Sequence, residues 1–277
     1  MGSIIEIQDL ELAQLQPFRC TNEIQLKRYY EPQPGIFVAE SPKVIRRALK
    51  SGYEPLTLLC EKKYISGQAS DIIEACGEAS VYTAESEVLT QLTGFRLTQG
   101  VLCVMRRKAL PDAEMLLEKA ERIVVLEDIM NQTNIGAIFR NAAALGADAV
   151  LLTPASSDPL YRRSIRVSMG TVFQVPWTYL SQTPPSYIDT LKEHGFFTVA
   201  MALRNDTLPI GDPSLSQHRR LAVILGTEGE GLKPQTIEAC SCTVKIPMSH
   251  GVDSLNVASA SGIVLWELMK NRDTLSE

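Results

Sequence analysis

The sequence has none of the long apolar stretches, paired cysteines or clustered histidines that would predict a membrane, disulfide-bonded or metal-binding protein. No run approaches the ~18 apolar residues that span a bilayer, and the first residues include acids where a signal peptide would be apolar. The six cysteines form no Cys-x-x-Cys pair, and the three histidines are scattered. We therefore expect a cytoplasmic protein with reduced cysteines, no metal and no membrane contact.

The sequence also lacks an excess of positive charge. Lys and Arg total 27 against 32 Asp and Glu, which gives a net charge of −5. Basic and acidic residues number 13 each up to residue 110, so the whole deficit lies beyond it. This balance excludes coating of nucleic acid by bulk charge. Any binding of RNA or DNA must come from a local basic patch.

Hydrophobic residues make up 45% of the chain, which is enough to build the cores of two domains. A charged stretch containing Pro111 separates two regions of regular pattern, and it predicts a linker with a short helix. We place an N-terminal domain over residues 1–108, the linker over 109–121 and a second domain over 122–277.

Both regions alternate apolar runs with helical patterns, which is typical of α/β domains. In the first region, the helix expected over 43–52 carries four basic residues around an apolar face. In the second, the last helix is expected from about Leu255 to Arg272. Six apolar runs of the second region predict strands at 123–128, 149–153, 172–177, 196–203, 220–226 and 243–248.

Strands separated by helices need crossover connections, so the sheet of the second domain should be mostly parallel. About six strands are too few for a closed eight-stranded barrel, and we expect an open sheet covered by helices on both faces. Ligands bind such sheets beyond the carboxyl ends of the strands, where three loops of this chain are unusual.

The first loop runs from Asn131 to Gly136 and enters a helix that carries Arg140. The residues leave two interpretations open. Asn134 is either a plain helix cap beside an exposed arginine, or part of a site in which a helix start and Arg140 bind an anion.

The second loop, Gly226 to Leu232, has three glycines that allow a ligand close to the main chain. Its spacing is neither the dinucleotide fingerprint nor a Walker loop. Glu228 and Glu230 would repel a triphosphate and favour a neutral or cationic ligand. A plain turn is the alternative.

The third loop, residues 246–258, leads into the last helix, for which Ser254 is a credible N-cap. Asn256 falls in the first turn of this apolar helix. A buried amide without partners costs about 1–3 kcal/mol, so Asn256 is either bonded to a loop or reserved for a substrate.

A basic patch interrupts the acidic second region. Arg162, Arg163 and Arg166 fall within about one helical turn. They are either a solvated helix face or a contact for a phosphodiester backbone.

The three loops, in this order, resemble the signature motifs of the SpoU/TrmH family of RNA ribose methyltransferases over about residues 122–272. The region of residues 166–170 is similar to a further stretch of that family, and residues 20–105 resemble, more weakly, an RNA-binding domain often attached to it. The motifs are Asn134-x-Gly136-x-x-x-Arg140, Gly226-x-Glu228-Gly229-x-Gly231-Leu232, and Ile246-Pro247-Met248 through Ser254-Leu255-Asn256-Val257.

The resemblance implies a parallel α/β domain whose C-terminal segment forms a deep trefoil knot, an exception to the usual absence of knots. It also implies a homodimer with active sites at the subunit interface, and S-adenosylmethionine as cofactor. The cofactor-binding residues implied are Ala202, Leu203, Leu225, Gly226, Gly231, Ile246, Met248 and Leu255.

The same resemblance assigns roles in catalysis. Arg140 would approach the target nucleotide, and because a guanidinium stays charged we favour contact with a phosphate or oxyanion over action as a base. Asn134, Ser254 and Asn256 would orient that group and the ribose. Glu228 would position Arg140 or backbone amides. Arg163 and Arg166 would hold the RNA backbone.

The sequence departs from the family pattern at Asn141, where Thr is frequent, and at Thr227, where Asn is frequent. These departures bear on the substrate more than on the cofactor. Two alternatives stay open: an RNA-binding or assembly factor that retains the fold without catalysis, and an enzyme of the same fold that methylates a base nitrogen. The sequence does not distinguish ribosomal from transfer RNA.

Overall fold

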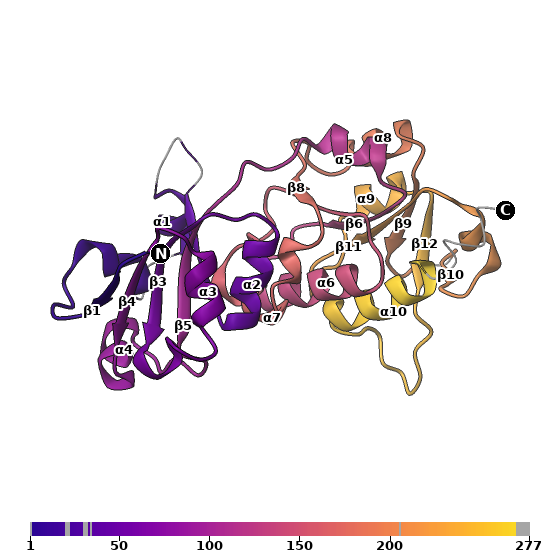
Figure 1. Ribbon diagram of the computed structural model, residues 1–277. Helices are drawn as coiled ribbons and strands as arrows, with labels where there is room; N and C mark the ends of the chain where they lie inside the picture. The colour runs from indigo at the N-terminus through magenta and orange to yellow at the C-terminus, as the bar shows by residue number, and fades with distance from the viewer. Residues whose placement is uncertain (1, 20–22, 30–32, 34, 205, 270–277) are drawn as a thin grey trace. The chain divides into compact units, whose positions relative to one another are not determined.

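The computed structural model describes residues 2–19, 23–29, 33, 35–204 and 206–269 (Figure 1). The chain divides into two compact units. The first combines Met1–Ala109 with Leu160–Gln174, and the second combines Leu110–Pro159 with Val175–Glu277. Among the described residues, no helix has the length and apolar character needed to cross a bilayer, and no group of three or more potential metal ligands is found.

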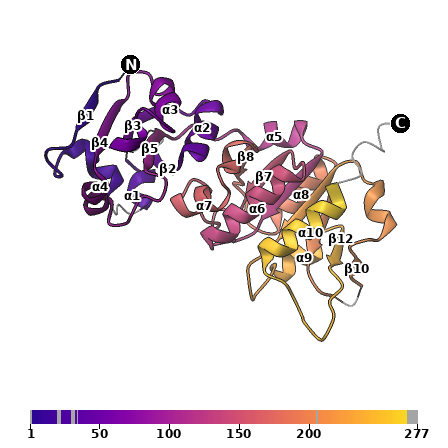
Figure 2. The ribbon, with the colours of Figure 1, turned by 60° about the horizontal axis from the view of Figure 1, so that its bottom comes forward.

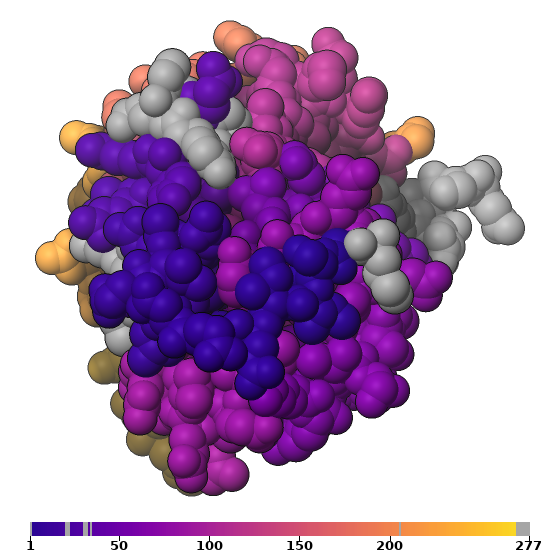
Figure 3. Space-filling view, turned by 60° about the vertical axis from the view of Figure 1, so that its left-hand side comes forward, coloured from indigo at the N-terminus to yellow at the C-terminus, as the bar shows by residue number. Residues whose placement is uncertain are grey.

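The first unit is built on a five-stranded mixed sheet in the order β1-β4-β3-β5-β2. The edge strand β1 pairs in parallel with β4, while β5 pairs antiparallel with β3 and β2. Figure 3 views this unit with its N-terminal residues in indigo lying against violet and magenta residues. The strands are β1 (Ile4–Glu6), β2 (Ile36–Glu40), β3 (Pro55–Glu61), β4 (Ser80–Ala84) and β5 (Val101–Arg106).

Helices of the first unit come from two separate stretches of chain. Among the described residues, four α-helices lie in the N-terminal stretch, and α7 lies in the segment Leu160–Gln174, which the sequence analysis places in the second domain. The predicted domain boundaries stay a prediction, but the structure packs this segment with the first unit. The helices are α1 (Glu23–Lys27), α2 (Pro42–Lys50), α3 (Ser70–Ala75), α4 (Ser86–Thr93) and α7 (Arg162–Val167).

A tight turn after α7 fixes this segment against α2. Met169 and Gly170 have left-handed backbones with φ of 53° and 79°. A Cβ on Gly170 would lie 3.4 Å from Val44 Cα, so a glycine allows the close approach. Arg47 donates to the carbonyl oxygen of Met169 at 2.7 Å. Ser168 is buried and accepts the Gly170 amide at 3.2 Å, so two residues of the region 166–170 that resembles the family serve the turn.

The second unit is built on a seven-stranded sheet in the order β10-β12-β9-β11-β6-β7-β8, and every pairing is parallel. The prediction of a mostly parallel open α/β sheet is confirmed. Continuous apolar runs form its central strands because both faces are covered. The strands are β6 (Arg122–Leu126), β7 (Ala149–Leu152), β8 (Trp177–Tyr179), β9 (Phe197–Met201), β10 (Leu208–Pro209), β11 (Leu221–Leu225) and β12 (Cys242–Lys245).

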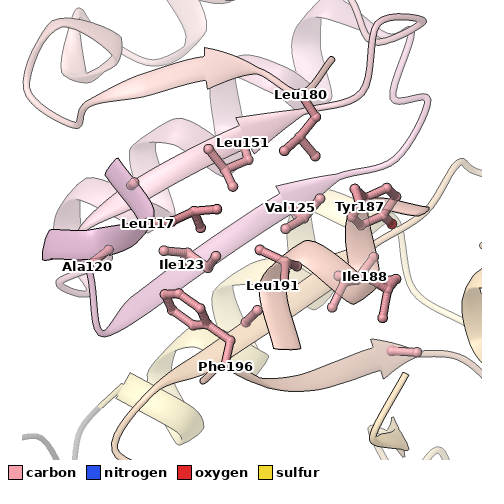
Figure 4. Close-up of a cluster of buried hydrophobic side chains, with 14 of the residues drawn as sticks. Leu117, Ala120, Ile123, Val125, Leu151, Leu180, Tyr187, Ile188, Leu191 and Phe196 are labelled. Carbon is pink, nitrogen blue, oxygen red and sulfur yellow. The ribbon is translucent and has the colours of Figure 1, made fainter. Parts of the chain in front are cut away.

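Helices cover both faces of this sheet (Figure 1). Side chains of α5 (Ala113–Lys119) and α8 (Ser186–Glu193) join one core cluster on β6, β7, β9 and β11 (Figure 4). Partly buried side chains of α9 (Pro234–Ala239) pack against this cluster. On the other face α6 (Gln132–Ala144) lies beside α10 (Val257–Met269), as Figures 1 and 2 both show. Asn141 Nδ2 links the two helices through Ala258 O at 2.9 Å and Ser261 Oγ at 2.8 Å.

Several elements of the second region differ from the prediction. The strands β9 and β12 end before the predicted ends at 203 and 248, and β10 was not predicted. The strand predicted over 172–177 is wrong: Thr171–Phe173 forms a 3-10 helix and β8 starts at Trp177. Its apolar residues are buried for another reason, because the Phe173 ring packs 5.5 Å from that of Phe37 in the first unit. The last helix begins at Val257, two residues later than expected, and its expected end lies outside the described residues.

Candidate functional site

Strand register brings the three unusual loops of the second unit to one edge of the sheet. Leu225 at the end of β11 pairs with Leu126 at the end of β6. On the other side, β11 pairs with β9, and Met201 at the end of β9 pairs with Val244 of β12. Because parallel strands end at the same edge, the segments that follow them must meet there.

A cavity of about 390 Å³ lies at this edge. All eight residues that we expected to bind a cofactor line it, and so do Glu228, Ser254 and Asn256. Sequence reasoning missed the lining residues Met201, Thr227, Gly229, Val244, Lys245, Asp253, Val257 and Ala260. Most of these residues are adjacent in the chain to predicted residues, and Ala260 belongs to the run of small residues in α10. Extending each predicted segment by one or two residues would have identified most of them.

The glycine-rich loop is a closed hairpin. Thr227 and Gly231 exchange two backbone hydrogen bonds, each 3.1 Å long. Gly226 lies so close to the returning strand that a Cβ would stand 2.4 Å from the carbonyl carbon of Gly231. Gly229 and Gly231 have positive φ of 91° and 72°, which other residues rarely adopt. The loop is therefore a specific structure that only glycines at these positions allow.

Three polar side chains connect the three loops. Asn256 Nδ2 donates to Asn134 Oδ1 at 3.3 Å and also to Glu228 Oε1. Asn134 is buried, whereas Glu228 and Asn256 are exposed at the cavity. The first, second and third predicted motifs are thus joined by one amide, the carboxamide of Asn256.

The helix caps differ from those expected. Asn131, and not Asn134, caps α6 by accepting the Thr133 amide at 2.8 Å. Asn256 precedes α10 and accepts the Ala258 amide at 2.9 Å, so the expected capping by Ser254 and burial of Asn256 are both wrong. Asn256 thus uses both N–H donors of its amide on side chains of the other two loops and its oxygen on the first turn of the helix.

Arg140 lies elsewhere on α6. It is exposed and outside the lining of the cavity, and among the described residues its side chain has no hydrogen bond or ion pair. We had expected Glu228 to position Arg140 or backbone amides. In the structure the carboxylate of Glu228 accepts from Asn256 instead. The guanidinium of Arg140 is left available to a group that approaches from solvent.

The predicted basic patch belongs to the first unit. Arg163 and Arg166 are exposed on α7. Arg162 turns inward, where its guanidinium lies 3.4 Å from Glu40 and stacks 4.4 Å from the centre of the Phe95 ring. Burial lowers the pKa of Arg162, and the charge of Glu40 opposes the shift. Two of the three arginines therefore face solvent, and the third holds the segment in place.

Comparison with known proteins shows which family the chain is similar to. Residues 121–266 match the SpoU rRNA Methylase family. An uncharacterized tRNA/rRNA methyltransferase of Mycobacterium bovis is 35% identical over 95% of this chain and 92% of its own length. A 23S rRNA (guanosine(2553)-2′-O)-methyltransferase of Bacillus subtilis is 24% identical over 95% and 99%. The crystal structure of an AdoMet-bound rRNA methyltransferase from Sinorhizobium meliloti has a TM-score of 0.78 at 24% identity, covering 97% of this chain and 98% of that chain.

Proposed function

The chain belongs to the SpoU rRNA methylase family, and from this premise we propose that it transfers a methyl group from S-adenosylmethionine to a ribose 2′-hydroxyl of ribosomal or transfer RNA. The observation that carries the proposal is the cavity at the carboxyl edge of the parallel sheet, where residues of the glycine hairpin meet those of the third motif. The names of the relatives support RNA as substrate, and that of the Bacillus subtilis relative supports the ribose as acceptor.

The residues of the cavity fit S-adenosylmethionine. The cofactor is a nucleoside with a sulfonium centre, so its site needs apolar surface, main-chain hydrogen-bonding groups and negative charge. Leu203 and Leu255 supply exposed apolar surface. The close approach at Gly226 leaves main-chain atoms, and no side chain, at the end of β11. Glu228 supplies the carboxylate, which favours a cation over a phosphate.

When bound, the cofactor supplies an electrophilic methyl group, and the protein supplies alignment. The main chain of Leu225 and Gly226 and the segment from Ile246 to Met248 would hold the nucleoside of the cofactor, and Leu255 would close over it. The hydrogen-bonded chain Glu228–Asn256–Asn134 fixes the polar wall of the cavity. Ser254, exposed at the same wall, orients the ribose.

Arg140 acts on the RNA and not on the cofactor. A guanidinium is a poor base, so contact of Arg140 with a phosphate or the developing oxyanion is favoured over action as a base. Arg140→Ala is expected to abolish methylation while the affinity for S-adenosylmethionine, measured by calorimetry, stays within a few fold. A fully active variant would remove Arg140 from the mechanism.

The first unit binds the RNA substrate in this proposal. Arg163 and Arg166 contact the phosphate backbone, because they are exposed and adjacent on α7. The attachment of α7 to the first unit supports an RNA-binding role for that unit.

The active form is a homodimer with its active sites at the subunit interface, and its C-terminal segment is threaded as a trefoil knot. Trp266 is 62% exposed and Ile263 is 40% exposed on α10, an apolar pair that supports burial by a second copy. The meeting of two late loops at one cavity supports the knot. Sedimentation equilibrium tests the dimer by reporting the number of chains in the particle.

Two alternatives are separated by direct measurements. A non-catalytic RNA-binding factor need not bind S-adenosylmethionine, so calorimetry with the cofactor distinguishes it. An enzyme that methylates a base nitrogen is distinguished by mass spectrometry of nucleosides from treated RNA. A ribose methyl stays with the sugar fragment, and a methyl on the base fragment would contradict the proposal.

A further inference from the structure

The carboxylate of Glu127 is buried next to the glycine hairpin, which is the loop from Gly226 to Leu232. Glu127 follows the last residue of β6, and only 1% of its surface is exposed. Three donors surround it: the Lys233 amide reaches Oε1 at 2.9 Å, while Thr236 Oγ1 and Tyr187 Oη reach Oε2 at 2.7 and 2.6 Å. A buried charge is costly unless such donors satisfy it, so this arrangement is specific.

Two of the three donors lie in the segment that follows the hairpin, and the third lies on a helix that does not line the cavity. Lys233 and Thr236 lie just after the hairpin, where the chain enters α9. Tyr187 belongs to α8 (Figure 4). No residue of α8 lines the cavity. Burial raises the pKa of Tyr187 well above its ordinary value, and the charge of Glu127 raises it further, so the phenol remains a donor.

Glu127 and its neighbour Asp128 hold the glycine hairpin at both ends. At its start, the backbone amide of Glu127 donates to Leu225 O at 2.9 Å. At its end, the side chain of Glu127 accepts the Lys233 amide, and the side chain of Asp128 forms an ion pair with Lys233 Nζ at 2.8 Å. Glu228, at the tip between these ends, reaches Asn256. A shift of the hairpin would therefore break the polar wall of the cavity.

We propose that Glu127 is a positioning residue for the cofactor site, which it serves by fixing the exit of the glycine hairpin through Lys233 and Thr236. This inference rests on the proposed function. Glu127 does not line the cavity and touches no substrate or cofactor in this role. Its carboxylate sets where the main chain of the hairpin and the carboxylate of Glu228 stand.

A matched pair of variants separates positioning from general stability. Thr236→Val and Tyr187→Phe each remove one hydroxyl hydrogen bond to the same oxygen of Glu127, and each keeps the shape of the side chain. Both donors are buried, so both variants are expected to lower the melting temperature by similar amounts. Only Thr236→Val removes a hydrogen bond between Glu127 and the segment that follows the hairpin.

Two measurements on the full-length protein follow. In hydrogen exchange, Thr236→Val is expected to speed exchange of the Thr227 and Gly231 amides, and Tyr187→Phe to leave it unchanged. In calorimetry with S-adenosylmethionine, Thr236→Val is expected to weaken binding by about fivefold or more, and Tyr187→Phe by less than about twofold.

The outcomes distinguish the inference from the proposed function. If the unaltered protein does not bind S-adenosylmethionine, the proposed function fails, and hydrogen exchange still decides whether Glu127 positions the hairpin. If the unaltered protein binds but the two variants behave alike in both measurements, Glu127 is merely structural and the inference is wrong.

Discussion

The two regions assigned to function are built in opposite ways. The cavity of the second unit is formed by four segments that sheet register brings together, and its wall is a chain of hydrogen bonds from Glu228 to Asn134. The basic patch of the first unit is two arginines on one short helix, exposed to solvent. The first is a site defined by main-chain geometry, and the second is a surface defined by charge.

The difference predicts how each region tolerates change. A site built on close main-chain approach should fail when one atom is added at the point of contact. A surface built on charge should weaken in steps and depend on salt, because each lost phosphate contact removes a similar increment. Three variants, one of them a double substitution, test these expectations.

The largest effect is expected from Gly226→Ala. The added Cβ would stand 2.4 Å from the carbonyl carbon of Gly231, and backbone cannot move aside as a flexible side chain can. The hairpin must open, and affinity for S-adenosylmethionine in calorimetry should fall by at least about 100-fold, or ~2.7 kcal/mol.

Gly229→Ala is the control within the same hairpin. Its Cβ would meet nothing within 4 Å, so only the positive φ of 91° opposes it. That cost is about 1–2 kcal/mol at most. Equal losses from both substitutions would mean that the close approach at Gly226 is not what shapes the cavity.

An intermediate effect is expected from replacing Arg163 and Arg166 together by Ala. RNA affinity should fall by about tenfold, and the dependence of log affinity on log salt should become shallower by about one to two. Affinity for S-adenosylmethionine should not change, because both residues lie on the first unit. Arg46→Ala serves as control, since Arg46 is exposed on the same unit but paired with Asp71 at 2.6 Å. An equal loss of RNA affinity in that control would contradict a specific patch.

The smallest effect is expected from Asp128→Asn. Burial alone would raise the pKa of Asp128, but hydrogen bonds from Lys233 and Thr153 and the charge of Lys233 outweigh it and lower the pKa. A lowered folded-state pKa stabilises the protein above the unfolded value of about 3.9. That contribution is lost as the pH falls through the folded value.

Denaturant unfolding across pH measures this contribution. Asp128→Asn should cost about 0.5–1 kcal/mol near neutral pH, and the difference from the unaltered protein should vanish in acid. Asparagine also tolerates the left-handed backbone of Asp128, with φ of 57°, so the substitution removes charge without backbone strain. A difference that persists undiminished at pH 2 would contradict the ion-pair explanation.

Local patterns marked the three unusual loops, and the resemblance to the family supplied the eight residues that line the cavity. The end of an apolar run marks the end of a buried strand, and glycines beside acids after Leu225 mark a loop with unusual backbone. The same reasoning identified the open parallel sheet from strands that alternate with helices. Sequence patterns do not provide the distances between loops. The contact of Asn256 with both Glu228 and Asn134 was therefore left as one of two alternatives.

Other features depend on tertiary contacts that no local pattern encodes. The apolar run at 172–177 was interpreted as a strand, but Phe173 packs against Phe37 and Tyr53, more than a hundred positions earlier. Glu127 falls inside the strand predicted over 123–128, and its side chain was assigned no role. Its burial follows from donors on α8 and α9 that lie far along the chain.

The membership of Leu160–Gln174 in the first unit means that the polypeptide passes between the units three times. A single proteolytic cut cannot release either unit intact. A fragment starting at Leu110 would carry the buried Ile165, Val172 and Phe173 without their packing partners, and is expected to aggregate. A chimaera that took only Met1–Ala109 from a relative would combine that piece with the Leu160–Gln174 segment of this chain, and the surfaces that pack together would not match. The two pieces of the first unit must therefore be exchanged together.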